Sequence, residues 1–306
     1  MQRRMILAGL AALAGFAAWR WVPRPRSLSD GDWQAAFATP LTPPTGPLKT
    51  YHLGQSLVGR DMPAMLAQLA GHDHRSQQGW GASLQQHWNG DVPGFAEENA
   101  HPNHHPAHPA ISSGTYDALI FTEMVELRDA IRWHDSASAL ADWATVARAA
   151  TPAARLYLYE TWHRLDDPAG WLTRIDTDLP ALWEGQLQRP AMAQAGGGPI
   201  YIIPGGQVMA AATRAIEAGD VPDLTSRHDL FQPGDTIHFN DLGAYLMALT
   251  HSAVLYHRSP EGLPHALTRA DGQPAQAMTA EAAKVLQQVV WQVVTRYPAT
   301  GVAQVR

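Results

Sequence analysis

An acid and a base stand three residues apart near the end of the chain, in the stretch GDTIHFNDLGAYLMA from Gly234 to Ala248. At this spacing the Asp235 carboxylate can orient the His238 imidazole, fix its tautomer and stabilise its protonated form. An oriented histidine is a general base, and it requires a nucleophile whose proton it removes. Because the chain contains no cysteine, a serine is the first candidate for that nucleophile.

Ser56 is the serine whose setting best fits a nucleophile. It follows the stretch KTYHLG (Lys49–Gly54), which is predicted to form a strand that leads into a turn. The surrounding GQSLV does not match the G-x-S-x-G elbow of α/β-hydrolases, because Val58 occupies the place of the second glycine. The alternative interpretations are that Ser56 only forms a turn, and that Asp235 and His238 only cap and fill a loop.

Three stretches, in this order, resemble the sequence blocks of the SGNH (GDSL-like) hydrolases. HLGQSLVGRD resembles the first block, QQGWGASL (Gln77–Leu84) resembles the second, and GDTIHFNDLGAYL resembles the last. The resemblance covers roughly residues 48–256. Each block alone is a weak signal, but their occurrence together and in order favours catalysis over the alternatives.

The resemblance implies a serine hydrolase with a defined set of residues. Ser56 would be the nucleophile, His238 the base and Asp235 its orienting partner. The backbone amides of Ser56 and Gly81 would stabilise the oxyanion of the tetrahedral intermediate. The family fold is a flavodoxin-like α/β/α sandwich.

Two positions depart from the family pattern. Gln55 replaces the usual Asp or Asn before the serine, which is expected to affect the turn more than the chemistry. Met124 stands where the third block normally supplies an Asn, and a thioether cannot donate a hydrogen bond to an oxyanion. Thr122 is therefore predicted as a third oxyanion donor, with Gln207 as the second choice. Glu123 is expected to point away from the oxyanion or to bind substrate hydroxyls.

The predicted reaction is the hydrolysis of small O-acyl esters, for example acetyl esters, on carbohydrate. Glu123, Trp162 and Gln207 are the candidate substrate-binding residues, and Trp162 can stack on a sugar ring or simply pack in the core. An O-acyltransferase and a non-catalytic carbohydrate- or ligand-binding domain on the same scaffold remain alternatives. A third alternative is a metal-dependent protein that uses the histidines of HPNHHPAHP (His101–Pro109), although an exposed, flexible loop is favoured there. The predicted serine esterase requires no metal and no cofactor.

Short apolar strands alternate with helices along the chain. This pattern predicts an α/β fold, a three-layer α/β/α sandwich with a mostly parallel sheet, in which ligands bind beyond the carboxyl ends of the strands. The expected strands cover residues 49–54, 116–123, 154–161 and 198–206. The expected helices cover residues 61–71, 138–150, 167–187 with a break near Pro180, 207–219, 241–256 and 279–297.

The 306 residues carry a net charge of −6 without a long basic block, which argues against nucleic acid as a partner. Residues 1–26 combine a basic start with a short apolar run, and are predicted to be a signal sequence or an N-terminal membrane anchor. Residues 27–47 are predicted to be a linker that wraps the domain, and residues 48–306 to be the hydrolase-like domain. The protein is therefore expected to be exported, either periplasmic, secreted or anchored facing the periplasm.

Overall fold

A computed structural model describes residues 26–304, and its centre is a five-stranded parallel sheet. The strands lie in the order β2-β1-β3-β4-β5, the order of flavodoxin-like doubly wound folds. The predicted fold class is confirmed. The strands are β1 (Lys49–Gln55), β2 (Asp73–Gly79), β3 (Ala118–Phe121), β4 (Arg155–Glu160) and β5 (Tyr201–Pro204).

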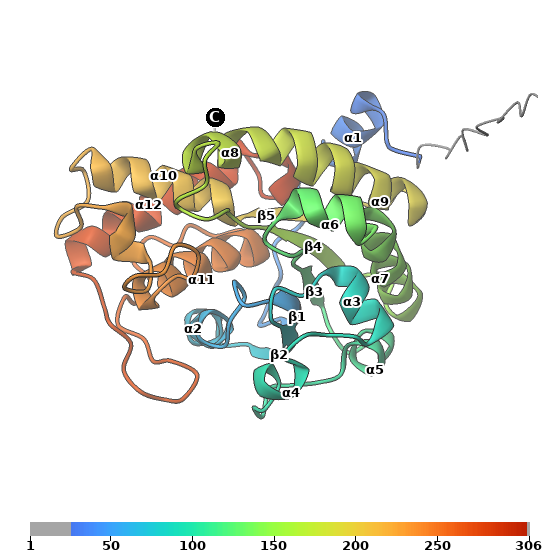
Figure 1. Ribbon diagram of the computed structural model, residues 1–306, viewed down its shortest axis with the longest axis horizontal. Helices are drawn as coiled ribbons and strands as arrows, with labels where there is room; N and C mark the ends of the chain where they lie inside the picture. The colour runs from blue at the N-terminus through green and yellow to red at the C-terminus, as the bar shows by residue number, and fades with distance from the viewer. Residues whose placement is uncertain (1–25, 305–306) are drawn as a thin grey trace, which may run out of the picture.

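Helices cover both faces of the sheet, which makes three layers (Figure 1). One layer contains α2 (Asp61–Ala70), α10 (Gly205–Glu217), α11 (Asp241–Tyr256) and α12 (Ala280–Arg296). The other layer is built around α7 (Ser136–Ala150), with α3 (Leu84–Asn89), α5 (Ala107–Ser112), α6 (Leu127–Trp133) and α9 (Arg189–Gln194) beside it. The shorter elements are α1 (Asp30–Ala36), α4 (Phe95–Glu98) and the 3-10 turns Arg227–Leu230 and Pro298–Thr300.

The helix expected over residues 167–187 is divided in two. The α-helix α8 (Trp171–Asp178) passes at Leu179 into a π-helical segment that runs to Gln188. Pro180 lies at the start of that segment, where its missing N–H and its ring disturb the α-helical hydrogen bonds. The chain stays helical through Pro180, so the expected break takes the form of a change from α-helical to π-helical hydrogen bonding.

Strand β2 was not expected from the sequence. Its residues, DHRSQQG, include no β-branched or aromatic side chain, so the usual strand signal is missing. The strand forms because it pairs in parallel register along β1, from Lys49 beside Asp73 to Gln55 beside Gly79. It lies at the edge of the sheet, and its buried glutamines Gln77 and Gln78 are accommodated because their side chains are hydrogen-bonded inside the protein.

Of the three predicted segments of the chain, the structure describes the linker and nearly all of the domain. Residues 1–25, most of the predicted signal sequence or anchor, lie outside the described residues. Between residues 26 and 304, no helix is long and apolar enough to cross a bilayer. The segment predicted as a linker contains α1, and Phe37 after it is buried. Trp33 in α1 also donates from Nε1 to Gln188 Oε1, so this segment packs against the domain as expected of a wrapping segment.

Two side chains of the histidine-rich loop have defined contacts with the domain. His105 lies within hydrogen-bond distance of the Tyr116 hydroxyl, at 3.0 Å from Nδ1, and the ring of His108 packs on Trp88 and Trp143. Helix α5 begins at Ala107 inside this stretch. Within residues 26–304 no three His, Cys, Asp or Glu side chains are grouped to hold a metal ion. His105 and His108 are exposed as expected, and their contacts hold both side chains in defined positions.

Candidate active site

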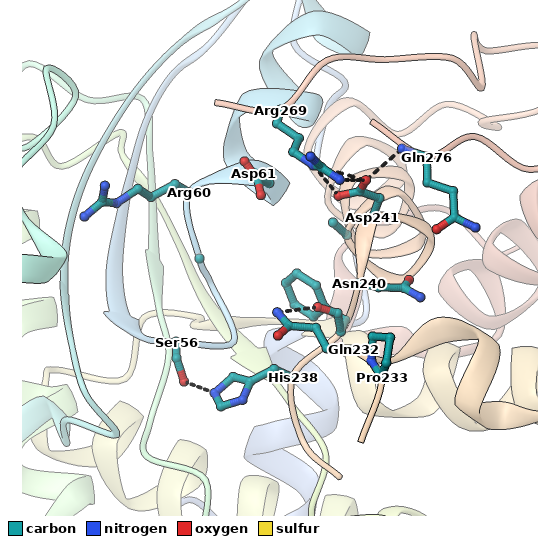
Figure 2. A pocket seen from close by; sticks show the side chains of 13 residues that line it. Ser56, Arg60, Asp61, Gln232, Pro233, His238, Asn240, Asp241, Arg269 and Gln276 are labelled. Atoms are coloured by element: carbon teal, nitrogen blue, oxygen red, sulfur yellow. Dashed lines mark hydrogen bonds and ion pairs between the residues drawn. The ribbon is translucent and has the colours of Figure 1, made fainter. Parts of the chain in front are cut away.

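Ser56, His238 and Asp235 form a continuous chain of hydrogen bonds at the carboxyl edge of the sheet. Figure 2 shows the link between Ser56 and His238. The Asp235 Oδ2 atom lies 2.8 Å from His238 Nδ1, and His238 Nε2 lies 2.9 Å from Ser56 Oγ. An ionised carboxylate accepts only, so Nδ1 carries the ring proton and Nε2 is free to accept the serine proton. The structure thus brings the three predicted residues together in the order that proton transfer requires.

The turn that presents Ser56 depends on the two residues before it. A Cβ atom at Gly54 would lie 2.6 Å from the Cβ of Thr122, so only glycine allows β1 and β3 to approach this closely. The Gln55 side chain accepts a hydrogen bond from the Leu57 amide at 2.8 Å, and the Val58 amide donates to the Gln55 carbonyl. Gln55 therefore closes the turn that projects Ser56 from the end of β1.

The loop that carries His238 is a tight hairpin. Phe231 and Phe239 form an antiparallel bridge, and the turn between them places Pro233 and Gly234 at its centre, with φ of 77° at Gly234. Pro before a residue of positive φ is a favoured turn pair, because proline presets its own φ and glycine accepts the next one. The hairpin thus fixes where the imidazole of His238 enters the site.

Asn240 and Gly243 join this hairpin to helix α11. The Asn240 side chain accepts hydrogen bonds from the amides of Leu242 and Gly243, which caps the helix, and donates to the Phe231 carbonyl. A Cβ atom at Gly243 would lie 2.5 Å from the Leu230 carbonyl oxygen. Asn240 and Gly243 therefore hold the hairpin, and with it His238, at the start of a buried helix.

Asp235 is held in its ionised form. Burial alone would raise the pKa of this carboxyl, but hydrogen bonds from the amide and ring of His238 and from the Ile237 amide lower it to about 2. The Oδ1 atom accepts both amides, at 2.7 Å from Ile237 and 3.0 Å from His238, while Oδ2 faces the ring. Asp235 thus remains a carboxylate at neutral pH and orients the imidazole.

Trp162 supports the hairpin from behind and does not reach the cavity. Its side chain is fully buried, and Nε1 donates to the Ile237 carbonyl at 3.0 Å. The Leu165 amide donates to the neighbouring Thr236 carbonyl at 2.8 Å. The prediction that Trp162 stacks on a substrate sugar is wrong, and the packing alternative holds, because a ring with no exposed face cannot contact a ligand.

Three other predicted site residues are also engaged inside the protein. The Thr122 hydroxyl is buried beside Gly54 and cannot be reached by an oxyanion. Glu123 is fully buried and points away as expected. It accepts hydrogen bonds from the Leu84 and Met124 amides, and burial raises its pKa to about 7.

The side-chain amide of Gln207 donates to Glu160 and to the Ile175 carbonyl. The substrate-binding roles of Glu123 and Gln207 and the third-donor role of Thr122 are therefore wrong for this structure.

Gly81 lies in the turn that follows β2 and is exposed. Its φ of 54° is in the left-handed region, and no atom lies within 4 Å of the place where a Cβ would be. The residue is not among those that line the cavity beside Ser56. The half-buried Met124 donates its amide to the Glu123 carboxylate.

A polar cavity of about 460 Å³ opens beside Ser56 and His238. Figure 2 shows Arg60, Asp61, Asp241 and Arg269 around the space beyond the Ser56–His238 pair. Arg269 and Asp241 form a two-pronged ion pair, with Nη2 to Oδ2 at 2.6 Å and Nε to Oδ1 at 2.9 Å. The lining residues are Ser56, Gly59, Arg60, Asp61, Gln232, Pro233, His238, Phe239, Asn240, Asp241, Ala244, Arg269 and Gln276.

Sequence reasoning missed the charged residues of this cavity. Arg60 lies in HLGQSLVGRD and Asp241 in GDTIHFNDLGAYL. Their closeness in sequence to Ser56 and His238 could have indicated that they line the site. Arg269 belongs to a loop after α11 that matches no block, and the Ala270 amide beside it donates to Asp61 Oδ1. Nothing local in the sequence indicates that this loop folds back over the site.

No protein-family model matches this chain, and the comparison with curated proteins also finds no match. A solved structure of a DUF4886 family protein from Bacteroides uniformis has a TM-score of 0.56 and 15% identity, and the match covers 85% of this chain and 98% of that one. The shared fold is therefore established.

Two further matches bear the names of the family that the three blocks resemble. A protein assigned as an SGNH hydrolase from Slackia heliotrinireducens is 23% identical, with a TM-score of 0.42 over 68% of this chain and 98% of that one. A protein assigned as a GDSL-like lipase from Parabacteroides merdae is 13% identical, with a TM-score of 0.40 over 67% of this chain and 94% of that one. SGNH and GDSL-like proteins are thus among the structural neighbours of this chain.

Proposed function

We propose that this protein is a serine esterase of the SGNH type. The observation that carries the proposal is the hydrogen-bonded chain from Asp235 through His238 to Ser56 at the mouth of a cavity. Ser56 Oγ attacks the ester carbonyl while His238 Nε2 takes its proton. The tetrahedral intermediate collapses to an acyl-enzyme, and the protonated His238 gives the proton to the departing alcohol. Water, deprotonated by His238, then releases the acid and restores Ser56.

The oxyanion is assigned to backbone donors. The Thr122 hydroxyl is inaccessible, Met124 has a thioether, and the Gln207 amide donates to Glu160 and Ile175, so no predicted side chain remains for the third-donor role. Amides are preorganised by the turns that contain them, so they cost little to arrange when charge develops. We assign the stabilisation of the oxyanion to the backbone amides of Ser56 and Gly81. Each amide lies in the first turn after a strand. For both amides to stabilise the same oxyanion, the ester carbonyl attacked by Ser56 must place its oxygen between the end of β1 and the turn after β2.

The lining of the cavity favours an ester of a polar alcohol. Charges of both signs and the side-chain amides of Gln232 and Gln276 surround the space, and these groups pair with hydroxyls better than with an acyl chain of a lipid. Small O-acyl groups on carbohydrate fit this description. The apolar run near the start of the chain supports the further proposal that the protein acts after export.

Turnover of 4-nitrophenyl acetate tests the proposed activity. An acyl-enzyme mechanism predicts a rapid release of 4-nitrophenol that approaches one equivalent per chain whenever release of the acetyl group is the slower step. Stopped-flow absorbance at a large excess of ester measures both the burst and the steady rate. Absence of any turnover above the rate in buffer, in folded protein, would rule out the esterase.

A further inference from the structure

Trp80 is an exposed tryptophan beside the candidate active site. It comes directly after β2, and Gly79 at the end of that strand pairs with Gln55, the residue before Ser56. Trp80 and Ser56 therefore leave the sheet from neighbouring strands at the same edge. The side chain of Trp80 is 56% exposed, which is unusual for a large aromatic residue in an ordered turn.

The indole ring of Trp80 is fixed, although it is exposed. Nε1 donates to Glu98 Oε1 at 2.8 Å, and the backbone amide donates to the Pro93 carbonyl at 2.8 Å. A Cβ atom at Gly94 would lie within 2.5 Å of three ring atoms, so the ring lies flat across the Cα of this glycine. One face of the indole is thus covered by backbone, and the opposite face is left open to solvent.

The short helix α4, which contains Glu98, has contacts both with Trp80 and with Arg60 of the cavity. Arg60, which lines the cavity, donates from Nη2 to the carbonyl oxygens of Glu97 and Glu98 at the end of α4. Figure 1 shows α4 beside β2, and the two elements are in contact. Arg60 therefore links the cavity that it lines to the end of α4, where Glu98 also holds the ring of Trp80.

We propose that Trp80 is a stacking platform for a second sugar ring of a glycan substrate, whose ester-bearing ring occupies the cavity. This proposal rests on the proposed esterase function and names its substrate class as oligosaccharides of two or more pyranose rings. A pyranose has a face of C–H bonds that packs on an indole, while its edge carries hydroxyls. Arg60 and Glu98 lie beside the platform and can bond such hydroxyls. The polar cavity disfavours a lipid chain as the occupant.

Kinetics with two substrates test the platform. We compare acetylated xylotriose with 4-nitrophenyl acetate, which is too small to span the cavity and the platform. In the Trp80→Ala variant the ratio of kcat/KM for the trisaccharide over the small ester is expected to fall about three- to tenfold, mainly through KM, as loss of one stacking contact predicts. Trp80→Phe keeps a flat face and is expected to restore most of the ratio.

Trp133→Ala is the matched control. Trp133 is 65% exposed at the end of α6, under the guanidinium of Arg132, and is expected to leave both rates unchanged. An unchanged ratio in Trp80→Ala, or an equal loss in Trp133→Ala, would overturn the proposal. If kcat/KM for 4-nitrophenyl acetate fell as much as kcat/KM for the trisaccharide, the proposal would also be overturned, because the small ester does not reach the platform.

Binding of unacetylated oligosaccharides separates this proposal from the esterase. Isothermal titration with xylotriose, cellotriose and chitotriose needs no hydrolysis, so it reports on the platform even if the protein turns over no ester. We expect at least one trisaccharide to bind the wild type several times more tightly than the Trp80→Ala variant. If none of the three binds the wild type, or if both proteins bind equally, the platform is disproved, whatever the result of the ester assay.

Discussion

Replacement of Ser56 by alanine is expected to lower the steady rate of ester hydrolysis by about 10⁴- to 10⁶-fold and to remove the burst of 4-nitrophenol. The reason is that Ser56 Oγ is the atom that receives the acyl group, and a methyl group cannot replace it. His238→Ala is expected to produce nearly the same loss, since His238 Nε2, 2.9 Å from Ser56 Oγ, is the acceptor of the serine proton.

The losses in these two variants are expected to be non-additive. Once the nucleophile is absent, removal of its base costs little more, because the two groups act as one unit. The double variant Ser56→Ala/His238→Ala should therefore match the slower single variant. Ser112→Ala, on the exposed end of α5, is the control and should keep the wild-type rate. Wild-type turnover in a folded Ser56→Ala protein would require another nucleophile.

Asp235→Asn is expected to lower kcat by about 10²- to 10⁴-fold while leaving more residual activity than the loss of Ser56. The asparagine oxygen can still accept the amides of Ile237 and His238, which bind Oδ1 in the wild type, so the hairpin keeps its shape. Its NH₂ group then faces His238 Nδ1 and stabilises the tautomer in which Nε2 carries the proton. In that tautomer the imidazole cannot accept the proton of Ser56.

A spectroscopic readout separates this tautomer effect from a general disturbance of the loop. Proton NMR of the wild type should show a strongly hydrogen-bonded His238 Nδ1–H, since Oδ2 of Asp235 lies 2.8 Å from that nitrogen. The resonance should be missing in Asp235→Asn. Asp176→Asn, which alters an exposed ion pair with Arg214, serves as the control and should keep both the resonance and the rate. A fast Asp235→Asn enzyme would show that the carboxylate does not orient the base.

The parts of the site that the sequence could predict are the local ones. Ser56 sits in a turn whose shape depends on Gly54 and Gln55, and His238 sits in a hairpin closed by its own neighbours. Residues within a few positions determine both geometries, so the blocks carry the information. The α/β class and the parallel sheet followed from the apolar strands that alternate with helices along the chain. Only β2 was missed, because its pairing with β1 outweighs its polar composition.

The parts that could not be predicted depend on burial and on contacts between distant segments. Trp162 and Trp80 both follow strands, yet one is buried under the hairpin and the other is exposed on Gly94. Residue type does not distinguish them, because tertiary packing decides which ring meets solvent. Thr122 stood at the right place in the chain for a third donor, but its hydroxyl faces Gly54. Arg269 reaches the cavity only because its loop folds back to Asp61 and Asp241.

The identity of the residue that becomes acylated is the most direct test of the central claim. A fluorophosphonate probe reacts with an activated serine, and trypsin should then release Thr50–Arg60, TYHLGQSLVGR, in which Ser56 is the sole serine. Tandem mass spectrometry of the labelled protein should place one probe group per chain on Ser56, with no label in Ser56→Ala or after blockage by a slowly hydrolysed ester. A protein that hydrolyses esters while the probe modifies a different residue, or none, would contradict the assignment of Ser56 as the nucleophile.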